Sequence, residues 1–554
     1  MSDTAAGLLQ LLALLVALAV VWRPLGDWMA RVYATENHWR GERLIYRLTG
    51  VNPDSDQRAG TYAVSILMFS LVGVALLYLI QRLQGVLGFD QGHGAVDPGV
   101  AFNTAISFNT NTNWQSYTPE STMGAVTQMI GLTVQNFLSA AVGMAVAVAL
   151  VRGFVRSRAG GRIGNAWVDI VRGCMRVLLP IAVLGAVVLI ALGVVMSLRT
   201  GADVVGPDGH ASTLSLFPAA SQEAIKELGT NGGGVFNANS AHPFENPNAV
   251  TNWIEIFLLL VIPVSLTRTF GGMVGNQRQG VALLGAMTAI WGAMLAIIWT
   301  AEAHATGAAA VAAGANLEGK EVRFGVPASA LFVNATTSTS TGAVNSAHDS
   351  LSAFGGGGAL LNMLFSEMTP GGVGTGLYSI LVVAIVAVFL AGLMVGRTPE
   401  YLGKKLGRRE VTCAVIVVLA MPAVVLLGTG LAIALPATGN AMTNSGPHGL
   451  SEVLYAFAST TNNNGSAFAG LTVTSGFFQV ATGVAMLLGR FLPIVAVLAL
   501  AGLLSRQPRV EPSAGTLATD KPLFSVLVVG TIILVAAITF FPALALSPIA
   551  EGLS

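Results

Sequence analysis

Long apolar windows are the feature of this sequence that most restricts its fold. Stretches of about 20 apolar residues recur about ten times, and a helix of that length crosses the roughly 30 Å hydrocarbon core of a bilayer. Only 10% of the residues are charged, against about 25% in a soluble domain. The predicted spans lie near residues 5–24, 62–83, 125–151, 172–196, 252–275, 280–300, 357–396, 412–435, 475–503 and 523–546. We therefore predict an all-α polytopic membrane protein with ten transmembrane helices.

The residues around these spans exclude other kinds of site. Lys and Arg cluster by loop and the net charge is +1, so no nucleic-acid-binding face is expected. Cys174 and Cys413 lie near the starts of separate spans, and neither they nor His242 and His348 show a shared metal-ligand spacing. The first span follows an acidic start, "MSDT", instead of the basic start of a signal peptide, and we interpret it as retained.

Positive charges indicate the orientation, because cytoplasmic loops of membrane proteins hold an excess of Lys and Arg. On one side the connections carry Arg31, Arg40, Arg43, Arg47 and Arg58, then Arg152, Arg156, Arg158 and Arg162, then Arg397, Lys404, Lys405, Arg408 and Arg409. The long loops on the other side carry only Arg199, Lys226, Lys320 and Arg323. With ten spans, this alternation predicts that both termini lie on the outer side.

A repeated unit organises the chain. Four times, a span is followed by a short segment compatible with a helix, a run rich in Thr, Ser, Asn and Gly, and another span. The runs lie in "FNTAISFNTNTNWQ", "AIKELGTNGGGVF", "LFVNATTSTSTGAV" and "LYAFASTTNNNGSAF". We predict pore repeats at residues 61–160, 161–276, 277–400 and 401–505, with an N-terminal helix and cytoplasmic loop at 1–60 and a C-terminal helix at 506–554.

The four polar runs align place by place. In this register the loops are Asn111-Thr112-Asn113, Thr230-Asn231-Gly232, Ser340-Thr341-Gly342 and Asn463-Asn464-Gly465. The third place is Gly three times and Asn once, and these residues best tolerate a positive φ. We therefore expect a left-handed backbone at the third place of each loop.

Irregular backbone at membrane depth is tolerated only where it is buried in protein or lines a wet cavity. A ring of carbonyls from four such loops replaces the hydration shell of a cation, as in a potassium-channel selectivity filter. None of the four loops contains a carboxylate, so potassium fits better than calcium or magnesium. The alternative is that the runs are ordinary polar loops on the outer surface, but four of them at matching places favour the filter.

Five motifs carry a resemblance to a known family: "TNTNWQSY" (110–117), "TNGGGVFNANSAHPFENPN" (230–248), "TGAVNSAHDS" (341–350), "GRTPEYLGKK" (396–405) and "TTNNNGSAFAGL" (460–471). Over its whole length the chain resembles the potassium-binding A subunit of the bacterial Kdp potassium-transporting ATPase, in the superfamily of K⁺ transporters. These motifs separate it from the related Trk, Ktr and HKT transporters. Thr341 stands where some members have Cys, a change that a filter of backbone carbonyls tolerates.

The resemblance implies that the chain binds K⁺ from outside and that a P-type ATPase partner, the B subunit, uses ATP to drive it inward across the bacterial inner membrane. A C subunit and a small F subunit complete this complex, which membrane lipids surround. The sequence contains no DKTGT-type phosphorylation loop and no Walker motif, so the chain is not expected to be an enzyme on its own. The alternatives are the pore subunit of a Trk/Ktr-type ion-coupled transporter and a passive channel.

One charge lies deep inside a span. Arg490, in "LLGRFLPIV", is about 15 residues into its span, roughly 22 Å from the outer end. Such an arginine is costly in lipid unless it faces water or a partner. The resemblance implies a place beneath the filter, where Arg490 repels a cation that passes straight through. The alternative is a packing residue bonded to backbone carbonyls.

The apolar segment near 357–396 is too long for one span, because forty helical residues extend about 60 Å. The predicted break is at Pro370 and at Gly371, Gly372, Gly374 and Gly376. In the resembled family this broken helix borders a cavity and a tunnel toward the B subunit. Glu367 is predicted to be a transient cation partner there, with a hydrogen-bonded or lipid-facing carboxylate as the alternative. Gln115, directly after the first loop, resembles a family glutamine near the inner side of the filter.

Overall fold

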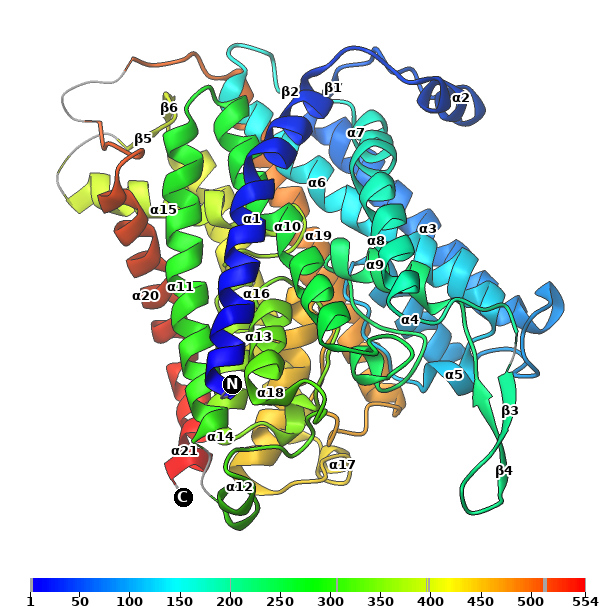
Figure 1. Ribbon diagram of the computed structural model, residues 1–554. Helices are drawn as coiled ribbons and strands as arrows, with labels where there is room; N and C mark the ends of the chain where they lie inside the picture. The colour runs from blue at the N-terminus through cyan, green and yellow to red at the C-terminus, as the bar shows by residue number, and fades with distance from the viewer. Residues whose placement is uncertain are drawn as a thin grey trace.

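The computed structural model describes residues 3–199, 201–304, 307–394, 396, 399–511 and 516–553. Within these residues ten helical segments are long and apolar enough to span a membrane, which confirms the predicted number. They are α1 (Asp3–Ala34), α3 (Ala59–Leu87), η1 with α6 (Thr127–Val155), α7 to α8 (Ala166–Ala191), α10 (Ala249–Met273), α11 (Gln277–Ala303), α15 (Thr375–Met394), α16 (Arg408–Ala434), α19 (Gly476–Arg506) and α20 (Pro522–Leu546). Figure 1 shows these helices packed side by side.

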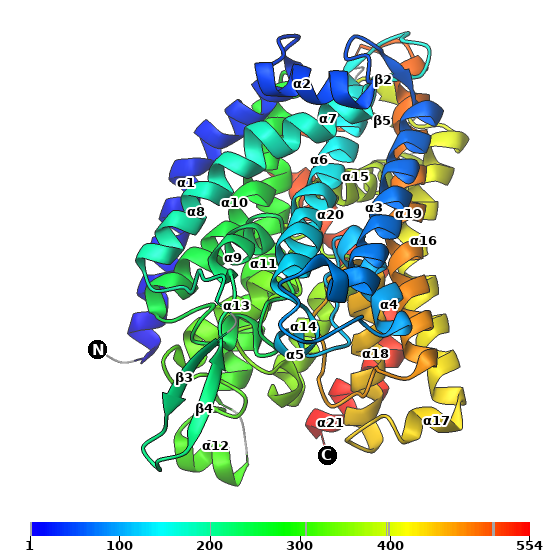
Figure 2. The ribbon, with the colours of Figure 1, turned by 90° about the vertical axis from the view of Figure 1, so that its right-hand side faces the viewer.

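Shorter elements connect the spans. Five short helices lie in the connections or near the C-terminus: α2 (Arg40–Thr49), α5 (Pro119–Thr122), α12 (Ala308–Ala313), α17 (Pro436–Gly439) and α21 (Pro548–Leu553). Three antiparallel strand pairs join β1 (Gln57–Arg58) to β2 (Arg162–Gly164), β3 (Gly201–Val205) to β4 (Ala211–Ser215), and β5 (Glu400–Tyr401) to β6 (Lys404–Lys405). Figure 2 shows β3 and β4 projecting away from the helical body.

Four helices that are too short to span a membrane lead into the polar runs. These pore helices are α4 (Pro98–Asn109), α9 (Ala219–Leu228), α13 (Gly325–Thr337) and α18 (Gly446–Asn462). The start of α4 is fixed by Asp97, whose carboxylate accepts hydrogen bonds from the backbone N–H of Gly99 and Val100 at 2.8 and 3.2 Å. Each pore helix ends just before one of the polar runs, so the chain contains four units of spanning helix, pore helix, loop and spanning helix.

The apolar segment near 357–396 is two helices, as its length predicts. The first, α14 (Ala353–Leu364), is followed by the ten residues 365–374 and then by α15, which begins at Thr375. We call residues 365–374 the break segment. It contains Pro370, which cannot continue a helix, and the glycines at 371, 372 and 374. Gly376 differs from the prediction because it already lies within the first turn of α15.

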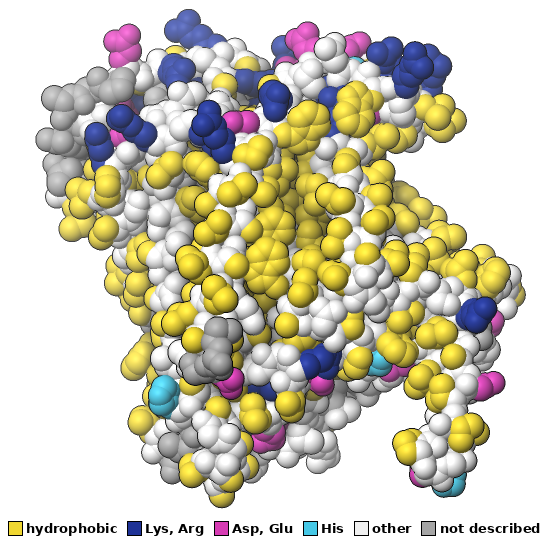
Figure 3. Space-filling view, viewed as in Figure 1, with side chains coloured by type: hydrophobic (Ala, Val, Ile, Leu, Met, Phe, Trp, Pro, Cys, Tyr) yellow, Lys and Arg dark blue, Asp and Glu magenta, His cyan; other side chains and the backbone are white. Residues whose placement is uncertain are grey.

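The two ends of the molecule differ in charge. Figure 3 shows Lys and Arg gathered at the end that holds α2, β1 and β2, which we call the basic end. The opposite end, where β3 and β4 project, is the loop end, and both α1 and α21 have their chain-terminal ends toward it (Figure 1). Hydrophobic side chains cover much of the side between the two ends (Figure 3). Arg397, one of the predicted cytoplasmic cations, lies outside the described residues.

Two of the four cations predicted in the outer loops are buried in ion pairs. Lys320 Nζ lies 2.6 Å from Glu302 Oε2. Lys226 Nζ, on pore helix α9, lies 2.7 Å from Glu223 Oε2 and 2.6 Å from Glu245 Oε2, and all three side chains are at most 1% exposed. The sequence analysis counted these lysines as loop charges because the folded positions of Glu245 and Glu302, 19 and 18 residues away along the chain, were not predicted.

Glu245 also connects the buried ion pairs to the chain that follows the second polar run. Its Oε1 atom accepts hydrogen bonds from the backbone N–H of Val235 at 2.8 Å and of Phe236 at 2.9 Å. Lys226 also donates to Asn239 Oδ1 at 3.1 Å. The ion pair therefore fixes the irregular chain between α9 and α10 against the pore helix.

We expect Lys226→Met to destabilise the protein by about 3–5 kcal/mol, because it leaves the carboxylates of Glu223 and Glu245 buried without their cation. The measurement is the thermal unfolding midpoint of the purified protein in detergent. Arg199→Met is the matched control, since Arg199 is an exposed cation in the same stretch of chain. Equal midpoints for the two variants would show that the buried pair contributes nothing to stability.

Candidate functional site

The four polar loops meet one another in a closed circuit of hydrogen bonds. Loop 1 reaches loop 2 through Asn111 Nδ2, which donates to Thr230 O at 2.7 Å. Loop 3 reaches loop 2 through Gly342 N, which donates to Asn231 O at 3.0 Å. Loop 4 contacts repeat 3 and loop 1, because Asn464 Nδ2 donates to Thr336 O at 3.2 Å and Asn463 Nδ2 to Thr112 Oγ1 at 3.0 Å. The four loops thus form one ring, here called the loop ring.

The third place of each loop faces the next loop around the ring. A Cβ atom at Gly232 would lie 2.4 Å from Gly342 Cα, and one at Gly342 would lie 2.8 Å from the carbonyl carbon of Gly465. A Cβ atom at Gly465 would lie 1.9 Å from Thr112 O. Asn113 completes the sequence, since its Nδ2 donates to Gly232 O at 3.0 Å. Three of the four third places therefore leave no room for a side chain.

The backbone at the third places agrees with the expectation in three loops and differs in one. The φ angles are 56° at Asn113, 102° at Gly232 and 102° at Gly465. Gly342 has no positive φ, so the expectation of a left-handed backbone is wrong there. A glycine is needed at position 342 because loop 4 lies too close for a side chain, and not because of the backbone φ angle.

The first places also have positive φ angles, which the sequence did not predict. The values are 69° at Asn111, 49° at Thr230, 52° at Ser340 and 60° at Asn463. Threonine and serine rarely adopt this conformation, so their neighbours must hold it. Left-handed residues therefore recur at matching places of the aligned loops, which agrees with the register taken from the sequence.

The pore helices add an electrostatic contribution to the loop ring. The pore helices α4, α9, α13 and α18 end at Asn109, Leu228, Thr337 and Asn462, each within three residues of the first place of its loop. The C-terminal end of a helix carries a partial negative charge. Four such ends directed at one ring favour a cation there.

The break segment packs against the first places of the loops. Val373 N donates to Thr230 Oγ1 at 2.8 Å, and Gly371 N donates to Ser338 O at 2.9 Å. A Cβ atom at Gly372 would lie 3.0 Å from the side chain of Ser340. Each pore helix runs inward from the loop end, and the first place of each loop follows soon after the end of its helix. The break segment, which contacts the first places, therefore lies on the side of the ring opposite to the loop end.

Glycines allow this close packing at two further points. A Cβ atom at Gly374 would lie 2.1 Å from the carbonyl carbon of Gly143 on α6, and one at Gly376 would lie 2.2 Å from Pro370 O. Gly371 and Gly374 also have φ angles of 83° and 84°. Gly372 and Gly374 therefore let the break segment approach the loop ring and α6, whereas Gly371 and Gly376 let the segment fold closely on itself.

Glu367 lies inside the protein and contacts loop 4. Its side chain is 1% exposed, and Oε1 accepts a hydrogen bond from Asn464 Nδ2 at 2.7 Å. Oε2 is buried and has no hydrogen-bond partner within the described part of the chain. The carboxylate is thus next to the second place of a loop and does not face lipid.

Arg490 lies beside loop 1 and the break segment. It is 2% exposed, and its Nη2 atom donates to Ser139 O at 3.0 Å. Ser139 in turn donates through Oγ to Asn111 Oδ1 at 2.8 Å. Among the ion pairs of the described residues none involves Arg490. A guanidinium bonded to a carbonyl, with no carboxylate partner, therefore sits on the same side of the ring as the break segment.

Gln115 lies on the other side of the ring, which differs from the expectation of an inner position. Its Nε2 atom donates to Gly234 O at 3.0 Å and to the hydroxyl of Tyr117 at 3.1 Å. Both Gln115 and Gly234 follow the third places of their loops, where the chain is returning to the loop end. Gln115 thus fixes loop 1 to the chain after loop 2.

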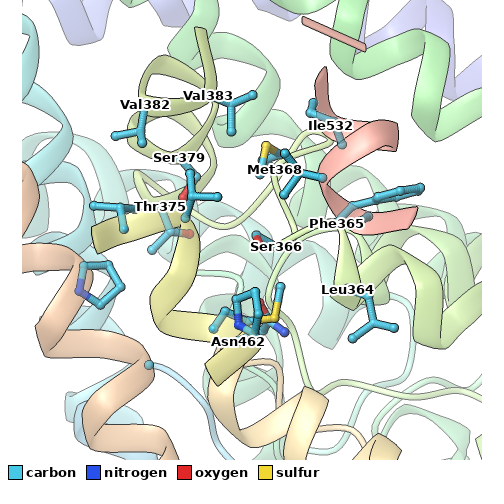
Figure 4. Close-up of a pocket in the computed structure, with 18 of the residues that line it drawn as sticks. Leu364, Phe365, Ser366, Met368, Thr375, Ser379, Val382, Val383, Asn462 and Ile532 are labelled. Atoms are coloured by element: carbon cyan, nitrogen blue, oxygen red, sulfur yellow. The ribbon is translucent and has the colours of Figure 1, made fainter. Parts of the chain in front are cut away.

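A cavity of about 90 Å³ lies next to the first places of loops 3 and 4. Ser340 and Asn463 line it together with residues of the break segment and apolar side chains of α15, α16 and α20. Figure 4 shows Ser366, Met368 and Asn462 around this space, with Val382 and Val383 on one wall and Ile532 on another. The resemblance implied a cavity beside the broken helix, but the lining residues of α16 and α20 were not predicted, because they come from separate segments.

The sequence matches known proteins over almost its entire length. The family described as potassium-transporting ATPase A subunit matches residues 12–553. The potassium-transporting ATPase potassium-binding subunit of Nocardia farcinica is 59% identical over 560 residues, and that of Rhodococcus erythropolis is 58% identical over 560 residues. In both comparisons the match covers 100% of each chain.

The fold is similar to that of a solved potassium transporter. The crystal structure of TrkH from Vibrio parahaemolyticus has a TM-score of 0.54 and 15% sequence identity, covering 86% of this chain and 97% of that chain. At this identity the likeness concerns the fold alone. The match to the family and the identity of 58–59% to full-length relatives are much closer, and they show that this chain belongs to the family of potassium-transporting ATPase A subunits.

Proposed function

We propose that this chain is the potassium-binding and translocating subunit of an ATP-driven K⁺ uptake complex in the bacterial inner membrane. The observation that carries the proposal is the closed ring of four polar loops at the ends of four pore helices. The full-length relatives are named as potassium-binding subunits of a potassium-transporting ATPase. The domain boundaries that we propose are the four pore repeats at 61–160, 161–276, 277–400 and 401–505, with the terminal helices outside them.

The proposed K⁺ site consists of the loop ring. Its members are Asn111, Thr112, Asn113, Thr230, Asn231, Gly232, Ser340, Thr341, Gly342, Asn463, Asn464 and Gly465. Backbone carbonyls of four loops coordinate a large, weakly hydrated cation, and the negative ends of the pore helices add to its binding. Divalent cations favour carboxylates, and the loops have none.

The proposed route of K⁺ beyond the ring is lateral. The break segment and Arg490 occupy the space below loops 1 and 2, whereas the cavity adjoins loops 3 and 4. A potassium ion that leaves the ring is thereby directed between α15, α16 and α20 toward a partner chain, with Glu367 as a transient cation partner. The partner that we propose is the P-type ATPase B subunit, accompanied by the C and small F subunits and by membrane lipids.

ATP chemistry belongs to that partner in this proposal. We propose that the basic end faces the cytoplasm, because Lys and Arg are enriched there, and that both termini lie on the outer side. A Trk/Ktr-type ion-coupled transporter is the alternative, and the TrkH-like fold is compatible with it. The proposal is favoured because the much closer relatives are subunits of an ATPase.

We expect Gly232→Ala to weaken K⁺ binding about tenfold and to reduce discrimination against Na⁺. Alanine at a φ of 102° costs about 1–2 kcal/mol, and its Cβ would meet Gly342 at 2.4 Å, so the carbonyls must move. The measurement is K⁺ and Na⁺ binding to the purified complex. Gly209→Ala is the control, since Gly209 has a φ of 80° but nothing within 4 Å of an added Cβ.

Gly233→Ala is not a suitable control for that experiment. Gly233 also has a positive φ, 70°, and an added Cβ would lie 3.2 Å from Phe108 and 3.4 Å from Asn113. If Gly232→Ala kept both the K⁺ affinity and the Na⁺ rejection of the unmodified protein, the second loop would not be part of the filter.

The isolated chain is expected to bind K⁺ without binding or hydrolysing ATP. In the complex, ATP hydrolysis should rise with external K⁺, because binding at the loop ring and catalysis in the partner are coupled. Phosphate release by the isolated chain and by the complex, each titrated with KCl, measures this. Sustained ATP turnover by the chain alone would contradict the assignment of catalysis to the partner.

Arg490→Gln is expected to keep external K⁺ binding but to add a passive leak. At an effective dielectric constant of about 20, a unit charge about 6 Å away repels K⁺ by about 3 kcal/mol, roughly a hundredfold in occupancy. The measurement is K⁺ flux into vesicles without ATP, together with K⁺-stimulated hydrolysis. Arg490→Lys, which keeps the charge, should leak less. Tight vesicles and normal coupling for Arg490→Gln would leave Arg490 as a packing residue.

A further inference from the structure

A cluster of potential metal ligands lies outside the spanning helices, in residues that the potassium route does not use. Asp349, in the short helix η4 (His348–Ser350), and His448 and Glu452, on α18, each offer one ligand atom, and these atoms lie within 4.8 Å of one another. His448 and Glu452 are four residues apart, so they share one face of α18. The cluster could not be recognised in the sequence, because Asp349 lies about a hundred residues from His448 along the chain.

The separation of two of these atoms suits a small tetrahedral ion. His448 Nε2 lies 3.2 Å from Asp349 Oδ1. Zn²⁺ binds imidazole nitrogen at about 2.0–2.1 Å and carboxylate oxygen at about 2.0–2.2 Å, so two such ligands at a tetrahedral angle are roughly 3.3–3.5 Å apart. An ion placed between the two side chains therefore needs only a small adjustment of either one.

The second nitrogen of His448 has the partner that a metal-binding imidazole commonly has. Nδ1 lies 2.8 Å from Oε1 of Glu551, on α21. Histidines that bind a metal usually donate their other ring N–H to a carboxylate or carbonyl, which fixes the ring and makes the ligand nitrogen more basic. Glu551 holds His448 so that its Nε2 atom faces Asp349.

Glu452 supplies a carboxylate that is not satisfied by the protein. Its side chain is 0% exposed, and Oε1 accepts hydrogen bonds from Asn444 Nδ2 at 2.8 Å and from Thr443 Oγ1 at 3.3 Å. Oε2 is buried and has no hydrogen-bond partner among the residues that the structure describes. A buried carboxylate oxygen without a partner is unfavourable, and a bound cation removes that cost.

A glycine keeps the space between the carboxylates open. A Cβ atom at Gly470 would lie 2.5 Å from Glu452 Oε1, 2.7 Å from Asp349 Oδ2 and 2.4 Å from Thr443 Oγ1. Any side chain at this position would enter the space between the two carboxylates. Gly470 belongs to the connection that follows loop 4, so a third segment borders the cluster.

The charge and ligand types select a divalent transition metal. Asp349, Glu452 and Glu551 are carboxylates, and within the described ranges no Lys or Arg forms an ion pair with Asp349 or Glu452. One imidazole nitrogen with two carboxylates is a ligand set that suits Zn²⁺, whereas Mg²⁺ and Ca²⁺ favour oxygen ligands alone. The site is thus chemically distinct from the loop ring.

We propose that Asp349, His448 and Glu452 bind one Zn²⁺ ion at the loop end, with Glu551 as the residue that orients His448. The ion joins the segment of repeat 3 that precedes α14, the start of pore helix α18 and, through Glu551, the C-terminal helix α21. It therefore acts as a structural clamp at the loop end, where these three segments meet. Glu551 is a positioning residue, because it acts through His448.

The test is zinc binding by the purified complex without a histidine tag, after chelator treatment and in buffer with excess KCl. Isothermal titration with ZnCl₂ should give one site per chain that KCl does not displace. His448→Ala and Glu452→Gln should abolish this site, and Glu551→Gln should weaken it by about 10- to 100-fold. His210→Ala is the matched control, since His210 is exposed on the β3–β4 hairpin, and it should bind as the unmodified complex does.

Two further measurements separate loss of the zinc site from misfolding and from failure of the proposed transport function. Co²⁺ added to the unmodified complex should give the visible absorption bands of a tetrahedral ion, and ZnCl₂ should remove them. K⁺ binding by each variant reports whether its loop ring has formed. The proposal is overturned if the unmodified complex binds no Zn²⁺. It is also overturned if His448→Ala or Glu452→Gln binds K⁺ normally and keeps the zinc site. In either case His448 is a protonated bridge between carboxylates.

Discussion

Backbone polar groups at membrane depth must find their partners within the protein, and this requirement shapes the centre of the molecule. The four polar loops meet it by bonding to one another. Side-chain amides supply several of these hydrogen bonds: Asn111 donates to the carbonyl of Thr230, and Asn113 donates to the carbonyl of Gly232. Where no amide bridges the gap, a glycine lets two loops come into direct contact, as Gly342 does beside Gly465. The Asn, Thr and Gly content of the loops follows from these contacts.

The same requirement accounts for the break segment. Its ten residues form no continuous helix, yet they lie between α6 and the loop ring, where the backbone N–H groups of Gly371 and Val373 find acceptors on the third and second repeats. Glu367 extends the contact to the fourth repeat through Asn464. Because three repeats share bonds with this one segment, it cannot move without changing the contacts of their loops. The conformation of the loop ring and the position of the break segment are therefore linked through these bonds.

Features that depend on local sequence were predictable, and features that depend on distant neighbours were not. Apolar length gave the ten spans and the break after α14, and the loop alignment gave the glycines of the ring. The backbone of Gly342 and the place of Gln115 beside Gly234 were missed because each is set by a residue from another repeat. The burial of Lys226 was missed because its partner Glu245 lies 19 residues away along the chain. The ligands around His448 were missed for the same reason, since they come from separate segments of the chain.

A ring built from one chain can differ from repeat to repeat, which a ring of four identical subunits cannot. Beneath loop 1, Arg490 holds the carbonyl of Ser139, whose hydroxyl bonds to Asn111, and beneath loop 2 the break segment bonds to Thr230. Beneath loops 3 and 4 lies the cavity that Ser340 and Asn463 border. One half of the underside is therefore filled and positively charged, and the other half is open. A cation on the filled side would be repelled by the guanidinium, so the differences between the repeats make the two halves of the underside electrostatically unequal.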